Sequence, residues 1–128
     1  MKYTEIAGTL IVEERGLLLL HREDKSWWEL PGGKVKEDES PTEAAVREAS
    51  EETGIEVQLE KPFFSGEFEH EGELFLWHGY IADTEDTPQL EEDKFTELKY
   101  FNAEELENKE LAPNLRQIQP ALRRLLSD

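Results

Sequence analysis

The segment between Ser40 and Gly54 carries strong signals for both ends of a helix. Ser40 is a favoured N-cap residue, Pro41 suits the first helical position, and Glu43 completes an S-x-x-E capping box. Gly54 supplies the left-handed residue that commonly ends a helix. The sequence therefore predicts a helix over 41–53 whose two ends are specified by local residues.

Three glutamates of this helix share one face. Glu48, Glu51 and Glu52 stand at i, i+3 and i+4, where like charges repel by roughly 0.2–0.5 kcal/mol per pair. A divalent cation would turn this repulsion into coordination, because hard cations such as Mg²⁺ prefer oxygen ligands. In a chain with 31 acidic and 14 basic residues, a solvated acidic face explains these three residues equally well.

The wider segment 33–55, GKVKEDESPTEAAVREASEETGI, separates the two interpretations. It resembles the Nudix box, Gly-x5-Glu-x7-Arg-Glu-U-x-Glu-Glu-x-Gly-U, in which U is a bulky aliphatic residue. The matching positions are Gly33, Glu39, Arg47, Glu48, Glu51, Glu52, Gly54 and Ile55. The first U is Ala49, smaller than usual, which concerns the packing of the helix and not the chemistry. The chain thus resembles a Nudix hydrolase.

The resemblance implies a divalent-metal site, with Mg²⁺ as the expected ion and Mn²⁺ as a substitute. It implies that Glu51 and Glu52 bind the metal directly, and that Glu48 is a further ligand or the base that activates water. Gly32 matches the position whose backbone carbonyl can join the metal shell, and a Gly-Gly pair lets backbone approach a ligand closely. The implied catalytic residues are Glu48, Glu51 and Glu52.

Two residues of the box are expected to support the metal ligands. Arg47 lies four residues from both Glu43 and Glu51, so it can hold a carboxylate in place. Glu39 is expected to be a supporting residue at the end of the loop before the helix, with metal ligation as the alternative.

Three candidate residues lie outside the box. Glu92, in the acidic loop 84–94, matches the further metal-binding glutamate of MutT-type members, and a solvated loop is the alternative. An aromatic at Trp27 or Trp28 can stack on a base; we name Trp28 as substrate-binding, although a core role for at least one is expected. Asn114 matches a base-binding asparagine, and helix N-capping explains it equally well.

The stretch WELPGGKV and the length near 128 residues resemble the MutT-like nucleoside triphosphate pyrophosphohydrolases. The resemblance implies hydrolysis of a nucleoside triphosphate, oxidised ones included, to the monophosphate and pyrophosphate. ADP-ribose or another nucleoside diphosphate sugar is the alternative substrate. A non-catalytic nucleotide sensor is an alternative of another class, but such proteins usually lose a box carboxylate. An isopentenyl diphosphate isomerase would need a cysteine, which the chain lacks.

The net charge of −17 restricts the partners that the surface can bind. It disfavours nucleic acid and anionic membranes, and it predicts that anionic substrates bind poorly until a metal occupies the glutamates. With no signal-peptide pattern and no apolar run near the ~18 residues of a membrane span, we expect a cytoplasmic protein. The acidity suggests a high-salt cytoplasm, and we expect a monomer or a homodimer.

The remaining segments predict a single domain, 1–128, of the α/β (α+β) class. Strands are expected at 5–12, 17–21, 27–30, 55–59, 63–69, 73–82 and 95–101. A helical turn is expected at 102–105 and a C-terminal helix over 113–126, kinked or restarted at Pro120. The Nudix resemblance implies an α/β/α sandwich with a mixed β-sheet between helices.

Overall fold

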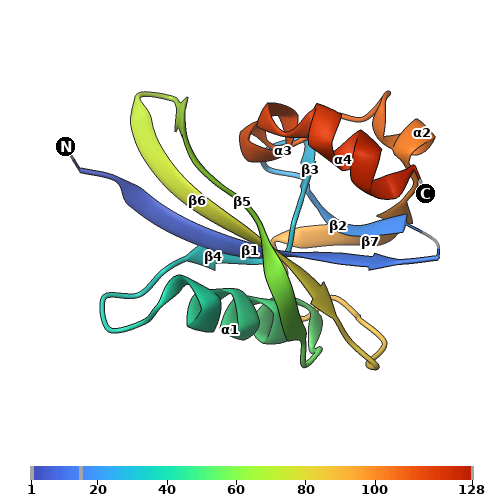
Figure 1. Cartoon of the computed structure of the whole chain (residues 1–128), viewed down its shortest axis with the longest axis horizontal. Coiled ribbons are helices and arrows are strands. Elements are labelled where there is room, and N and C mark those ends of the chain that lie inside the picture. The colour runs from blue at the N-terminus through green and yellow to red at the C-terminus, as the bar shows by residue number, and fades with distance from the viewer. Residues whose placement is uncertain (1, 15, 128) are drawn as a thin grey trace.

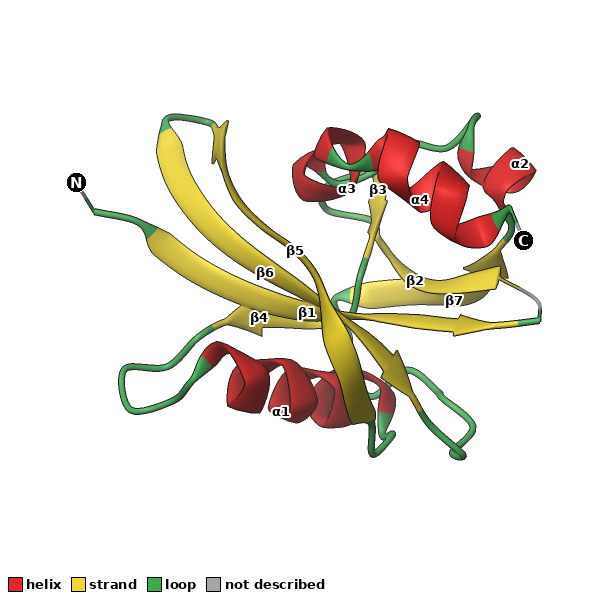
Figure 2. Ribbon diagram, viewed as in Figure 1, coloured by secondary structure: helices red, strands yellow, loops and turns green. Residues whose placement is uncertain are grey.

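The computed structural model describes residues 2–14 and 16–127, and these form a mixed sheet with helices on both sides (Figures 1 and 2). The strands are β1 (Thr4–Glu13), β2 (Gly16–Arg22), β3 (Trp27–Glu29), β4 (Gly32–Lys34), β5 (Gln58–His70), β6 (Glu73–Asp83) and β7 (Phe95–Phe101). The helices are α1 (Pro41–Thr53), α2 (Ala103–Leu106), α3 (Pro113–Gln117) and α4 (Gln119–Leu126). Helix α1 covers one face, and α2, α3 and α4 lie on the other, which confirms the predicted sandwich.

Strand β1 is the centre of the sheet. Its first part pairs with β4 in antiparallel and with β6 in parallel fashion, and its end pairs with β2 in antiparallel fashion. Strand β2 pairs in turn with β3 and β7, and β6 pairs with β5. The sheet is therefore mixed because of the single parallel pair β1–β6, as the sequence predicted.

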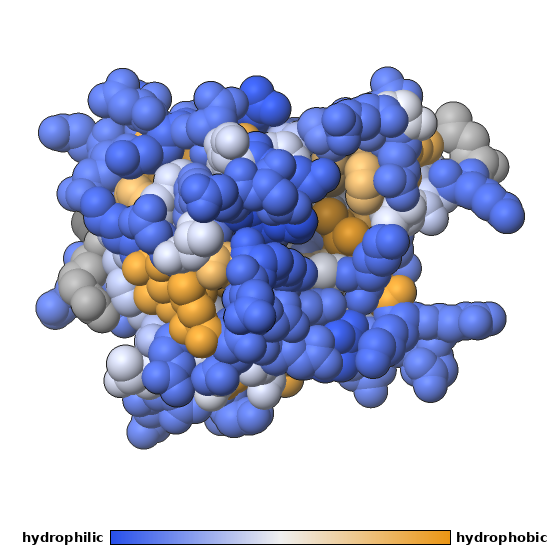
Figure 3. All heavy atoms as spheres, turned by 180° about the vertical axis from the view of Figure 1, so that it is seen from behind, coloured by the Kyte–Doolittle hydropathy of each residue, from blue (hydrophilic) through white to orange (hydrophobic). Residues whose placement is uncertain are grey.

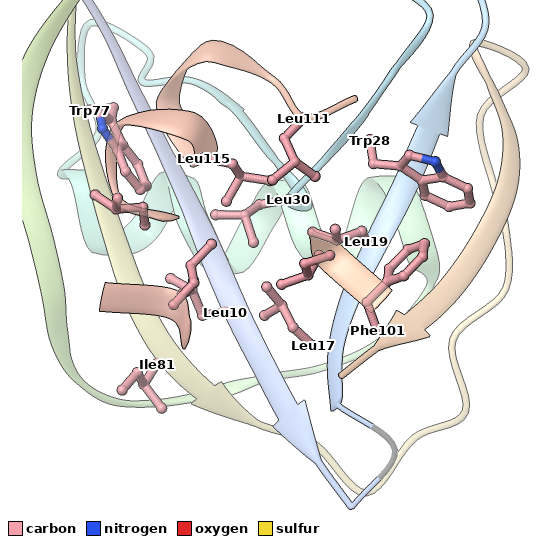
Figure 4. Close-up of a cluster of buried hydrophobic side chains, with 13 residues drawn as sticks. Leu10, Leu17, Leu19, Trp28, Leu30, Trp77, Ile81, Phe101, Leu111 and Leu115 are labelled. Atoms are coloured by element: carbon pink, nitrogen blue, oxygen red, sulfur yellow. The ribbon is translucent and has the colours of Figure 1, made fainter. Parts of the chain in front are cut away.

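The leucine run of β2 is buried because both faces of the sheet are covered. Leu17 and Leu19 pack into the cluster beneath α3 and α4, together with Leu115 (Figure 4). Leu18 points to the opposite face and packs with residues of the α1 side, including Ile55. The alternation follows from the two-residue period of a strand.

Helix α1 begins and ends where the sequence predicts. The Ser40 hydroxyl accepts a hydrogen bond from the Glu43 backbone N–H at 3.2 Å, and the Glu43 carboxylate accepts one from the Ser40 N–H at 2.9 Å. Gly54 adopts a left-handed φ of 72°. Ala49, the small residue at the aliphatic position, is fully buried in the cluster with Ile55. None of the helices in the described part of the chain is long and apolar enough to span a membrane.

Two elements differ from the sequence prediction, whereas the C-terminal helix follows it. The short strand β4 was not expected, because two of its three residues are glycines, which have low strand propensity. The strands expected at 55–59 and 63–69 form one strand, β5, whose register shifts near Pro62. The C-terminal helix breaks at Ile118 and restarts with Pro120 in the first turn of α4. Arg15, in the expected β1–β2 turn, lies outside the described residues.

Candidate active site

Glu52 is the most unusual residue of the molecule, because its carboxylate is completely buried. Oε1 accepts a hydrogen bond from the Gly32 N–H at 2.9 Å, whereas Oε2 has no hydrogen-bond partner among the described residues. Burial, reinforced by the Glu48 carboxylate, raises the pKa of Glu52 to about 9. An unpartnered carboxylate oxygen in such a place is a suitable ligand for a divalent cation.

Glu48 lies one turn before Glu52 and against the glycine pair. A Cβ placed on Gly33 would lie 2.6 Å from Cδ of Glu48, so only glycine leaves room for this carboxylate. Glu48 also lines the large cavity of the protein. The two carboxylates and the adjoining Gly32 backbone therefore form an oxygen-rich pocket end that fits a hard divalent ion.

Arg47 fixes the carboxylates around it. Its guanidinium donates to both oxygens of Glu39 at 2.6 and 2.9 Å, to Glu48 at 3.2 Å and to Glu51 at 2.9 Å. A further bond reaches the Lys34 carbonyl at 3.0 Å, which ties α1 to β4. In this arrangement Arg47 and Glu39 have the contacts of supporting residues.

Glu51 does not converge with Glu48 and Glu52. Its side chain is half exposed and turned towards Arg47. Within residues 2–14 and 16–127, no three acidic or histidine side chains meet in the geometry of a metal centre. Ligation by Glu51, as the resemblance implies, thus needs a change of its side-chain rotamer.

The Arg47–Glu39 pair gives a prediction for acid stability. Hydrogen bonds from Arg47 and from the Lys36 N–H lower the pKa of Glu39 from 4.5 to about 2. Because the folded pKa is depressed, the pair contributes stability above pH 4.5, and the contribution is lost as the pH falls through about 2. Urea unfolding should therefore show Glu39→Gln less stable than the wild type at neutral pH, with the difference vanishing near pH 2.

The exposed Glu37→Gln change is the matched control for this prediction, and it should leave the wild-type pH profile unchanged. A stability difference between Glu39→Gln and the wild type that persists unchanged to pH 2 would contradict the assignment.

The acidic loop 84–94 is tied to the end of α1. The Gln89 and Glu91 N–H groups donate to the carbonyls of Thr53 and Glu52 at 3.1 and 3.0 Å. This brings Glu92 to the site, where Lys94 Nζ lies 3.5 Å from Glu92 Oε1 and 3.6 Å from Glu52 Oε2. The loop residue expected near the metal is thus linked to Glu52 through a lysine that the sequence did not indicate.

A cavity of about 670 Å³ opens beside Glu48. Its wall includes four of the cationic side chains, Arg22, Lys25, Lys34 and Lys94, and four aromatic ones, Trp27, Phe68, Phe75 and Trp77. The face of the molecule seen in Figure 3 is mainly hydrophilic, with some hydrophobic patches. Arg22 and Lys25 come from one segment, and Lys34 and Lys94 come from two others, so no sequence pattern indicates that the four gather at one place. Glu29, Glu48 and Glu73 also line the cavity, so acidic and basic side chains are nearly balanced there, in contrast to the net charge of −17 of the chain.

Trp27 and Trp28 have different places. Trp28 packs in the core, with its ring 4.7 Å from that of Phe101 (Figure 4), and is not among the residues that line the cavity. Trp27 lines the cavity, and its ring lies 5.4 Å from that of His70. The substrate-binding role named for Trp28 has to be corrected, because its indole is used in the core, and Trp27 becomes the candidate.

Asn114 lines the cavity. The N-cap position of α3 is occupied by Ala112, with no side-chain cap, so N-capping does not explain the asparagine. Asn114 thus remains a candidate for binding substrate.

Comparison with known proteins identifies the family of this chain. The family model of the NUDIX domain matches residues 2–122. The chain belongs to the Nudix family. This confirms the resemblance seen in the segment 33–55, and relatives and solved structures agree with it.

Two relatives and one structure show how the chain compares within the Nudix family. It is 35% identical to the CTP pyrophosphohydrolase of Escherichia coli K12 over 97 residues, 72% of either protein. It is 47% identical over 58 residues to a putative 8-oxo-dGTP diphosphatase of Bacillus subtilis, a match covering 44% of this chain and 39% of that protein. The crystal structure of a MutT NUDIX hydrolase from Burkholderia pseudomallei superposes with a TM-score of 0.86 at 26% identity, covering 94% and 98% of the chains.

Proposed function

We propose that the protein is a Mg²⁺-dependent hydrolase that cleaves a diphosphate linkage in nucleoside diphosphate derivatives, with a nucleoside triphosphate as substrate. The observation that carries this proposal is the buried Glu52 carboxylate, whose Oε2 has no hydrogen-bond partner among the described residues. Glu52 lies one helical turn from Glu48, which lines a cavity with cationic and aromatic walls. The products are a nucleoside monophosphate and pyrophosphate.

The ion would be held by Glu48 and Glu52, with the Gly32 carbonyl, Glu51 and Glu92 as further ligands. When bound, the ion would neutralise phosphate charge and lower the pKa of a bound water. Mn²⁺ would substitute for Mg²⁺, because both accept oxygen ligands in octahedral geometry.

The residues of this chain supply the orientation and the proton transfer. Arg22 and Lys25 on the cavity wall bind phosphate oxygens and neutralise their charge. A Glu48 carboxylate oxygen accepts the proton of the attacking water, because Glu48 reaches the cavity whereas Glu52 is buried. Arg47 keeps Glu48 in position for this transfer.

The aromatic part of the cavity supports a nucleobase as the remainder of the substrate. Trp27, Phe68 and Phe75 offer planar surfaces for stacking, and Asn114 offers a donor and an acceptor for a base edge. A nucleoside triphosphate is favoured because the relatives are named a CTP pyrophosphohydrolase and a putative 8-oxo-dGTP diphosphatase. ADP-ribose, as a nucleoside diphosphate sugar, is the second candidate, and a non-catalytic nucleotide sensor is the third.

A nucleotide panel tests the proposal. Purified protein with Mg²⁺ should convert at least one nucleoside triphosphate to the monophosphate and pyrophosphate, as measured by chromatography of the products. Turnover of ADP-ribose alone would replace the substrate class. Nucleotide binding without turnover of any diphosphate derivative would favour the sensor and contradict the hydrolase.

Asn114→Ala tests the base-binding assignment. The loss of one or two hydrogen bonds to the base should raise KM about tenfold with little change in kcat, since binding is lost equally from ground and transition states. Asn102→Ala is the control, because Asn102 caps α2 and does not line the cavity. An unchanged KM in Asn114→Ala would remove Asn114 from the substrate site.

A further inference from the structure

The ammonium group of Lys94 is placed where a bound cation would be expected. It lies 3.6 Å from Oε2 of Glu52, the buried oxygen that has no hydrogen-bond partner among the described residues. It also lies 3.5 Å from Oε1 of Glu92. Within the described ranges, Lys94 supplies the only cationic group within 4.0 Å of Glu52. Two carboxylates proposed for metal binding therefore meet at one lysine.

The backbone at Lys94 is fixed on both sides. Phe95 is buried, begins β7 and pairs with Arg22 of β2. On the other side, the Glu91 N–H donates to the Glu52 carbonyl at 3.0 Å, and the Phe95 N–H donates to the Glu92 carbonyl at 3.3 Å. These backbone contacts hold Lys94 beside Glu52 and Glu92.

The side chain of Lys94, in contrast, is free to move away from Glu52. It is 42% exposed and lines the cavity. Its ammonium lies 5.1 Å from the centre of the Phe95 ring, a position that the long side chain can leave without disturbing the core. A group held by charge and not by packing can be displaced by a stronger cation.

We propose that Lys94 is a tethered counter-ion that occupies the cation position beside Glu52 Oε2 and Glu92 Oε1 in the metal-free protein and is displaced when a divalent ion binds. A divalent ion at Glu52 Oε2 and an ammonium at the same oxygen repel each other, so the two cations exclude one another. The lysine therefore lowers the affinity for the metal. This inference rests on the proposed function, which places the ion at Glu52.

Metal titration tests the inference on four proteins: the wild type, Lys94→Met, Lys99→Met and Glu52→Gln. Mn²⁺ binding is followed by the electron paramagnetic resonance signal of the free ion, and Mg²⁺ binding by calorimetry, at constant ionic strength. Lys94→Met should bind either ion about tenfold more tightly than the wild type, because the competing charge is gone. Lys99→Met is the matched control: Lys99 lies in β7 over the Phe101 ring and pairs with Glu105, away from the site. Its affinity should stay at the wild-type value.

Thermal unfolding in EDTA supplies a second measurement. Without metal, Lys94→Met removes one half-exposed cation, so its melting temperature should lie close to that of Lys99→Met. In saturating Mg²⁺ the melting temperature of Lys94→Met should be higher than that of Lys99→Met by about 5 °C, because tenfold tighter binding adds to the stability of the ion-bound state.

The outcomes separate this inference from the proposed function. Equal or weaker metal binding by Lys94→Met, together with loss of the site in Glu52→Gln, overturns the counter-ion role and leaves the proposed metal site in place. Unchanged affinity and stoichiometry in Glu52→Gln overturns the proposed metal site and the inference with it. Tighter binding by Lys94→Met, with Lys99→Met and the wild type alike, supports both.

Discussion

Replacing Glu52 with glutamine is expected to lower kcat/KM by about 10³-fold while leaving the protein folded. The amide keeps the size of the side chain and can still accept from the Gly32 N–H. It cannot supply a negatively charged oxygen at Oε2, which has no hydrogen-bond partner among the described residues. Steady-state kinetics on the best substrate of the panel measures the effect.

The same change should not destabilise the metal-free protein. Burial raises the pKa of Glu52 from 4.5 to about 9, so its contribution to stability is full below pH 4.5 and is lost as the pH rises towards 9. Glutamine does not titrate, so Glu52→Gln does not lose stability in this way as the pH rises. In EDTA at pH 8, Glu52→Gln should therefore be at least as stable as the wild type. The change of the exposed Glu56 to glutamine is the control for both measurements. A kcat/KM of Glu52→Gln within tenfold of the wild-type value would exclude Glu52 as an essential ligand.

Gly32→Ala should be the most destabilising small change at the site. A Cβ on Gly32 would lie 2.6 Å from the Ala7 carbonyl oxygen and 2.8 Å from the Gly8 Cα, both of which belong to the backbone of β1. No rotamer relieves such a clash, so β4 has to move away and the hydrogen bond to Glu52 is lost. We expect the free energy of unfolding to fall by about 2–4 kcal/mol and kcat/KM to fall about 100-fold.

Gly33→Ala is the informative comparison. Its Cβ would meet the end of the Glu48 side chain, which can rotate away. Stability should then change by less than about 1 kcal/mol, whereas activity should fall because the Glu48 carboxylate is displaced. Urea unfolding and kinetics of the two variants measure both quantities. Equal stabilities of Gly32→Ala and Gly33→Ala would show that the close approach of β4 to β1 is not required.

The helix of the site was predictable because its signals are local. Ser40 and Glu43 cap each other within one turn, and the spacing of Glu48 and Glu52 sets their common face. The glycine-rich strand β4 was not predictable, because its pairing with β1 depends on a close backbone approach between distant residues. The residues of the motif therefore predicted helix α1, but they did not predict that β4 pairs with β1 beside it.

The cavity wall depends on tertiary structure in the same way. Trp27 and Trp28 point to opposite sides of β3, and only the packing of Phe101 decides which of them enters the core. Lys94 reaches Glu52 because the loop is bonded to the end of α1, a contact with no sequence pattern. The cations on the wall also revise the expectation drawn from net charge, since an anionic ligand meets Arg22, Lys25 and Lys34 even before a metal is considered.

The position of β1 in the sheet has a consequence for the nascent chain. Helix α1 packs on a surface to which β6 contributes Tyr80 and Ala82, and β6 joins the sheet through pairs such as Ile6 with Trp77. Every residue of the motif 33–55 is synthesised before that surface exists. The surface beneath α1 is therefore complete only when a late strand inserts beside an early one, a long-range step of the kind that slows folding.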